Sequence, residues 1–238
     1  MSRPDPSNAP SPFLVAMAFA AVYLIWGSTY LGIRFATESI PPFLMAGTRS
    51  VTAGLLLYAV MRLRGAPRPS ALHWRSAAIV GGLLLMGGNG GVTWSEQRIP
   101  SGLAALIIAT VPMWMVMLDW LRPGGVRPHF RILIGLVMGL VGIILLVGPL
   151  GIAAYQQIDP LGVGVVILAA FLWSSGSIYA RRAPLPSAQL LATAMEMLAG
   201  GTLLLILSLA VGEWGRFDPG AVSLKSILTL AYLIVFGS

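Results

Sequence analysis

Seven stretches of 18 to 22 residues in this sequence are almost entirely apolar, and five of them contain no charged residue. A run of this length crosses the hydrocarbon core of a bilayer as a helix, because a helix satisfies its backbone hydrogen bonds without water. An eighth run begins near Leu224 and reaches Ser238, and we expect it to be an incomplete span. The sequence therefore predicts an all-α, polytopic membrane helix bundle with seven to eight spans. The seven complete runs are Phe13–Ile33, Phe43–Met61, Ser76–Trp94, Ser101–Leu118, Ile132–Pro149, Leu161–Ala180 and Leu190–Val211.

Composition excludes several classes of protein. Only 10% of the 238 residues are charged and 57% are hydrophobic, whereas about a quarter of a soluble domain is charged. Cysteine is absent and only two histidines occur, so we expect no disulfide, no protein-ligated metal and no cofactor. No catalytic motif is present, so we do not expect an enzyme. The 15 basic residues form short clusters between apolar runs, unlike the basic face of a nucleic-acid-binding protein.

These basic clusters predict the orientation of the chain in the membrane. Cytoplasmic loops of membrane proteins carry an excess of lysine and arginine. With a cytoplasmic N-terminus, ten basic residues lie inside and four outside, namely Arg34, Arg98, Arg216 and Lys225. We therefore predict a multi-pass cell-membrane protein whose proline-rich tail, residues 1–12, is flexible and cytoplasmic. The inside residues are Arg3, Arg62, Arg64, Arg68, Arg75, Arg122, Arg127, Arg131, Arg181 and Arg182.

The chain contains an internal repeat. A shift of 147 residues gives eight identities over the 32 positions from Trp26 to Leu57, including Trp26 with Trp173 and Gly54 with Gly201. The shift carries the first span onto the sixth, so one repeat holds five helices, and an odd number inverts the second copy in the membrane. Inverted repeats are typical of secondary transporters. We expect residues 13–150 to form the first repeat and residues 158–238 an incomplete second repeat of an expected ten-helix bundle.

Three segments resemble a known family. They are Tyr23–Tyr30, the part of the second span around Arg49, and above all the run Ser95–Trp114, which reads SEQRIPSGLAALIIATVPMW. These segments are similar to EamA-type permeases of the drug/metabolite transporter superfamily. The resemblance implies a ten-helix bacterial inner-membrane protein that exports small metabolites or drugs, with a small-molecule substrate and the lipid bilayer as its partners. A non-transporting scaffold or lipid-handling subunit built on the same repeat is the alternative.

Two charged residues lie inside apolar runs. Arg49 and Glu196 are each six residues into their span, and the 147-residue shift superposes them. Because a charge at membrane depth is costly, it usually faces a cavity or a partner. Arg49 could recognise a carboxylate and Glu196 could carry a proton. Alternatively, both side chains extend to the membrane surface.

Breaks within the third and fourth spans give further candidates for the substrate pathway. Asn89 lies in the run Gly87–Gly91, where glycines permit either unwinding beside a substrate or close helix packing. Pro112 should kink the fourth span, and Trp114 could stack on a substrate or face lipid. In the fifth span, Gly135 and Gly139 have a spacing that favours helix packing alone.

The first and sixth spans carry related clusters of aromatic and hydroxyl residues. Trp26, Ser28 and Tyr30 are related by the repeat to Trp173, Ser175 and Ser177. We expect the first three, with Trp173 and Ser175, to line the two ends of one substrate pathway; an aromatic belt at the membrane interface is the alternative. Glu96, Gln97 and Arg98 are expected to form a solvated outside loop.

Overall fold

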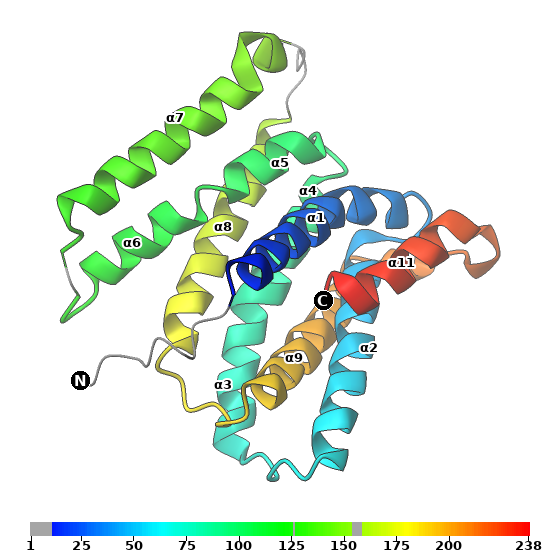
Figure 1. Ribbon diagram of the computed structural model, residues 1–238. Coiled ribbons are helices and arrows are strands. Elements are labelled where there is room, and N and C mark those ends of the chain that lie inside the picture. Colours follow the sequence, from blue (N-terminus) through cyan, green and yellow to red (C-terminus); the bar gives the residue numbers. More distant parts are fainter. Residues whose placement is uncertain (1–10, 126, 154–158) are drawn as a thin grey trace.

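The computed structural model describes residues 11–125, 127–153 and 159–238 (Figure 1), and the regular elements in this part of the chain are helices. The predicted tail, residues 1–12, therefore lies almost entirely outside the described residues. Each predicted run coincides with one helix or with consecutive helices. Six of these segments are long and apolar enough to cross a membrane. The unbroken ones are α1 (Pro12–Ala36), α2 (Pro42–Leu63), α8 (Pro160–Ala180) and α9 (Gln189–Ala210).

The remaining two membrane-length segments are composite. The third span comprises α3 (Ala71–Gly81), the π-helix η2 (Gly82–Gly90) and α4 (Gly91–Ser95). The fourth comprises α5 (Ser101–Ile108) and α6 (Val111–Leu121). The fifth and eighth predicted runs lie in α7 (Phe130–Ala153) and α11 (Leu224–Phe236), and the short helices α10 (Glu213–Arg216) and η3 (Pro219–Ala221) precede α11.

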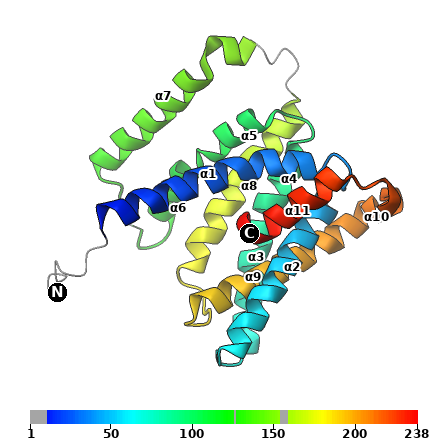
Figure 2. The same ribbon diagram turned by 45° about the vertical axis from the view of Figure 1, so that its right-hand side comes forward.

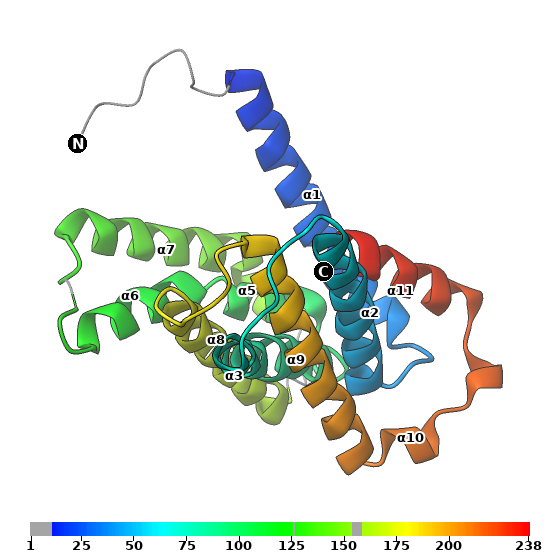
Figure 3. The same ribbon diagram turned by 90° about the horizontal axis from the view of Figure 1, so that it is seen from below.

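Four segments form the centre of the molecule. Helices α2 and α9 pack along one another, α3 packs on α9, and η2 and α4 pack on α8. Helix α1 crosses this group beside α11 (Figure 2), and its N-terminal half extends away from the bundle (Figure 3). Apolar side chains of this half, such as Phe13, Leu14 and Leu24, are 61–74% exposed, as expected for a surface that faces lipid.

Glycines set the approach of α2 to α9, and their contacts are reciprocal. A methyl group on Gly54 would lie 3.0 Å from both Met197 Cβ and the backbone nitrogen of Leu198. A methyl group on Gly201 would lie 2.9 Å from Ser50 Cβ and 2.8 Å from the backbone nitrogen of Val51. The positions on the two helices are related by the 147-residue shift in every case. The same surface of each helix therefore contacts its counterpart.

The glycine-rich run of the third span widens the helix without ending it. Residues 82–90 form a π-helix, a form that is common at functional sites. Its glycines lie against α8 and α9: a methyl group on Gly88 would lie 3.1 Å from the Trp173 ring, and one on Gly90 would lie 2.7 Å from Leu204 Cδ2. The run thus serves close packing while it also displaces the helical register around Asn89.

The fourth span is broken at the position where a kink was expected. Helix α5 ends at Ile108, Thr110 donates to the carbonyl of Ile107, and α6 begins at Val111 with Pro112 in its first turn. Proline is favoured in a first turn because its missing N–H would have no intrahelical partner there. In α7, a methyl group added to Gly135 or Gly139 would meet no atom of the described structure within 4 Å, so the close packing expected from their spacing does not occur within this part of the chain.

Candidate functional site

A pocket of about 300 Å³ lies among α1, α2, the third span, α8 and α9. Two of its lining residues carry a charge and six others carry a hydroxyl or amide group. All of these except Ser238 lie within membrane-length segments, so they converge where lipid could not solvate them. The lining residues are Trp26, Thr29, Tyr30, Ile33, Arg49, Ser50, Leu84, Leu85, Asn89, Val92, Trp173, Thr193, Glu196, Met197, Gly237 and Ser238.

The two charged residues of the pocket do not pair with each other. Arg49 is only 5% exposed, and its Nε has no hydrogen-bond partner among the described residues. No ion pair joins Arg49 to Glu196 in this part of the chain, where the bridges are Arg98–Asp159, Arg122–Asp119 and Lys225–Glu38. A buried guanidinium without a partner is costly. Arg49 therefore retains unused capacity to bind an anionic group.

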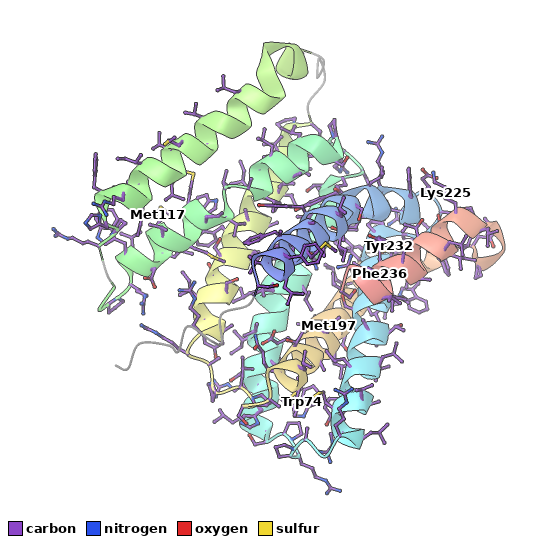
Figure 4. All side chains as sticks on the ribbon, viewed as in Figure 1. Trp74, Met117, Met197, Lys225, Tyr232 and Phe236 are labelled. Carbon is purple, nitrogen blue, oxygen red and sulfur yellow. The ribbon has the colours of Figure 1, made fainter. Side chains whose placement is uncertain are left out.

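Six of the ten residues predicted for the substrate pathway lie on this one pocket. Arg49 comes from α2, Asn89 from η2 and Glu196 from α9; the others are Trp26, Tyr30 and Trp173. Met197 of α9, which Figure 4 labels, also lines the pocket. Trp26 is 57% exposed, so its ring lies at the edge of the pocket and also reaches the outer surface of the bundle.

Comparison with known proteins identifies the family. Residues 13–148, more than half of the chain, match the model of the EamA-like transporter family. The chain belongs to the EamA-like transporter family. It is 40% identical over 222 residues to the uncharacterized inner membrane transporter YedA of Escherichia coli K12, a match that covers 93% of this chain and 69% of YedA. This EamA-like chain is therefore a multi-pass membrane protein of a transporter family.

Two further comparisons extend this result. The EamA-like chain is 23% identical over 171 residues to a protein of Escherichia coli K12 named a probable amino-acid metabolite efflux pump, covering 68% of this chain and 51% of that protein. A solved crystal structure has a TM-score of 0.64 to it at 21% sequence identity, covering 91% of this chain and 72% of the other. The latter similarity establishes the helical fold.

Four predicted site residues of the EamA-like chain lie away from the pocket. Ser28 bonds to the hydroxyl of Tyr232 at 2.6 Å, which joins α1 to α11, and Ser175 donates to the carbonyl of Phe171 in its own helix. Pro112 lies in the first turn of α6. Trp114 packs edge-on against Phe171, with ring centroids 5.5 Å apart, and lines a separate apolar groove of about 520 Å³ between α6 and α7.

Four hydroxyl residues of the pocket were not anticipated from the sequence of this EamA-like chain, namely Thr29, Ser50, Thr193 and Ser238. Thr193 precedes Glu196 by three residues and Thr29 follows Trp26 by three, so both follow from helical spacing once Glu196 and Trp26 are taken as pocket residues. Ser50 has no such signal, because residues adjacent on a helix do not share a face.

The turn between α4 and α5 corrects one expectation. Gln97 and Arg98 are exposed as predicted, but Glu96 is only 5% exposed. Arg98 donates to Asp159 at 3.0 Å and lies 4.3 Å from the centroid of the Trp94 ring. The hydrogen bond from Arg98 holds the pKa of Asp159 below its usual range. Glu96 was expected to be solvated because a turn residue is usually at the surface, whereas here the turn folds it inward.

A second buried acid supports the helix that carries Arg49. Glu213, on α10, accepts hydrogen bonds from the backbone nitrogens of Phe43 and Leu44 and from the hydroxyl of Ser208, at 3.2, 2.8 and 2.7 Å. The first N–H groups of a helix have no partner within the helix, and a negative charge is favourable there. Glu213 therefore fixes the start of α2, one and a half turns before Arg49.

Proposed function

We propose that the chain forms part of a secondary transporter that exports a small solute across the bacterial inner membrane by alternating access, with its N-terminus in the cytoplasm. The observation that carries this proposal is the interior pocket in which Arg49 and Glu196 lie without an ionic partner among the described residues. Charged groups inside membrane segments usually mark substrate or ion pathways. The name of the related efflux pump supports export as the direction.

An inverted repeat underlies the proposed mechanism. The reciprocal contacts of Gly54 and Gly201 support it, because equivalent surfaces contact each other at a two-fold interface. Residues of the expected first repeat, on α1, α2 and the third span, and of the expected second repeat, on α8, α9 and after α11, both line the pocket. Movement of the first repeat relative to the second would open the pocket alternately to each side of the membrane.

The lining residues suggest distinct roles. Arg49 binds an anionic group of the solute, because its buried guanidinium has an unpaired Nε. Asn89, Thr193 and Ser50 supply neutral hydrogen bonds, and the rings of Trp26 and Trp173 form apolar walls. Glu196 carries the proton whose movement drives transport.

Transport assays test these roles. A growth-protection screen of cells that express the protein, against a panel of toxic metabolites, first identifies a solute, and efflux of that radiolabelled solute is then measured in proteoliposomes. Glu196→Gln should abolish efflux driven by a pH gradient and preserve exchange of solute for solute, because exchange moves no net proton. Arg49→Ala should weaken binding about tenfold or more, most strongly for anionic solutes.

The matched control is Glu38→Gln, since Glu38 is an exposed acid paired with Lys225 away from the pocket. Normal pH-driven efflux by Glu196→Gln would remove the proton-carrier role. Protection and flux that are absent for every solute in the panel would favour the scaffold or lipid-handling alternative.

A further inference from the structure

Glu96 is a buried acid without a hydrogen-bond partner. Its side chain lies at the turn that joins the third span to the fourth, it is 5% exposed, and neither carboxyl oxygen has a partner among the described residues. Buried polar groups are paired in the great majority of cases, and an exception calls for an explanation. The pocket roles proposed above do not use Glu96.

The neighbours of Glu96 on its own turn are occupied elsewhere. Arg98 is held by Asp159 at the start of α8 and by the Trp94 ring. The Ser95 hydroxyl donates to the carbonyl of Gly91 at 2.7 Å. The turn is thus fixed to α8, and the groups that could have neutralised Glu96 are directed away from it.

Helix α1, which contacts α5 directly after this turn, supplies a charged and a titratable group that face Glu96. Tyr30 and Arg34 interact with it electrostatically, and the described structure contains no ion pair between Arg34 and Glu96. On α2, the charged residue closest to the start of the helix is Arg49. Arg49 also forms no ion pair with Glu96 in the described part of the chain. Tyr30 lines the central pocket and Val92, one turn before Glu96, does so too.

The environment favours the neutral acid. Burial raises the pKa of Glu96 to about 8, and the charge of Arg34 opposes this rise only in part. A solvated glutamate has a pKa near 4.3. The packed turn therefore holds a proton at neutral pH that a solvated turn would release.

We propose that Glu96 is a proton-binding site separate from Glu196: it is protonated while the α4–α5 turn is packed against α1, and it loses the proton to the adjacent aqueous phase when the turn separates from α1. Because Tyr30 and Val92 belong both to the surroundings of Glu96 and to the pocket wall, the proton and the bound solute affect each other's affinity reciprocally. This coupling to transport rests on the function proposed above, whereas the proton site itself does not.

The sign of the pH dependence follows from linkage. The packed turn binds more protons than the separated turn between the two pKa values, so raising the pH from about 4.3 to about 8 favours separation. Below this range both states are protonated, and above it both are ionised. The equilibrium for separation should increase about tenfold for each pH unit between pH 5 and pH 7.

Two single cysteines in this cysteine-free chain measure the separation without any substrate. Ser95→Cys places a thiol at a fully buried position beside Glu96, and Gln97→Cys places one at an exposed position of the same turn. Both variants are labelled with a methanethiosulfonate reagent on purified protein in detergent. The ratio of their labelling rates cancels the pH dependence that thiol ionisation gives to both reactions. We expect this ratio to rise about tenfold per pH unit from pH 5 to pH 7 and to level off above pH 8.

The variant Glu96→Gln is the decisive comparison, because it keeps the shape of the side chain and cannot ionise. The labelling ratio should then be independent of pH. A ratio that is flat in the parent chain, or that rises equally in Glu96→Gln, would overturn the proton site. If the ratio titrates as expected while no solute is transported, the proton site stands and the transport function proposed above fails.

Discussion

Three buried or pocket-lining glutamates occupy different environments, and their roles differ accordingly. Glu213 has three hydrogen-bond donors and supports the start of α2. Glu96 has no donor among the described residues, and Glu196 lines the pocket beside Arg49. A carboxylate whose donors are all provided is typical of a structural role, whereas one that lacks them is available for a proton or a ligand.

The structural role of Glu213 predicts a loss of stability on amidation. Glu213→Gln keeps the size of the side chain but removes its charge and turns an amide NH₂ toward one of the donors. We expect a loss of about 1–2 kcal/mol in the free energy of unfolding. Thermal unfolding in detergent measures it, with Glu38→Gln as the control, because the exposed Glu38–Lys225 pair contributes at most about 1 kcal/mol. Equal melting temperatures of Glu213→Gln and the parent would contradict this role.

At the scale of helices, the apolar runs predict positions well and internal geometry poorly. Each run coincides with a helical segment, because the bilayer leaves an apolar backbone few alternatives to a helix. The π-helix η2 and the break before α6 depend instead on contacts of Gly88 with Trp173 and on the turn at Thr110. Gly88 and Trp173 are distant in sequence, so a local pattern does not specify the π-helix, whereas the break before α6 is local and Pro112 indicated it.

The same distinction applies to the candidate site. Arg49 and Glu196 could be predicted because a charge in an apolar run is conspicuous, and the structure brings both to one pocket. Ser50 could not, since it is adjacent to Arg49 and residues adjacent on a helix do not share a face. The burial of Glu96 could not either, because it depends on how the turn packs beside α1.

The contact between α2 and α9 predicts a matched effect of two glycine substitutions. An alanine methyl at Gly54 or at Gly201 would lie 2.8–3.0 Å from backbone nitrogens of the facing helix, which cannot move as a side chain can. Overpacking of this kind costs about 1–3 kcal/mol. We expect Gly54→Ala and Gly201→Ala to lower the melting temperature in detergent by similar amounts.

Gly164→Ala in α8 is the control for this pair, because no atom of the described structure lies within contact distance of a methyl group there. Alanine also favours helix more than glycine does, by about 1 kcal/mol, so this control should be neutral or stabilising. Unchanged stability of both Gly54→Ala and Gly201→Ala would show that the two helices do not approach each other as closely as described.

At the scale of the whole molecule, the two ends of the bundle differ in charge. The turn after α2 carries Arg64 and Arg68, whereas the turn after α4 carries Glu96 and a single arginine, Arg98, which Asp159 neutralises in part. Basic residues near span ends are retained in the cytoplasm during insertion. This asymmetry, together with the order of the spans, predicts that the turn containing Gln97 is periplasmic and that the turn containing Arg64 is cytoplasmic.

Labelling in intact cells tests this orientation, since the chain has no cysteine of its own. Gln97→Cys and Arg64→Cys each replace an exposed side chain in a turn between spans, so that each thiol is accessible from the aqueous phase on its own side of the membrane. A membrane-impermeant maleimide should label Gln97→Cys in intact cells, and it should label Arg64→Cys only after the membrane is permeabilised. Because replacing Arg64 removes one of ten predicted inside charges, the remaining nine still favour the same orientation. The opposite labelling pattern would invert the topology and would place the proton site at Glu96 on the cytoplasmic side.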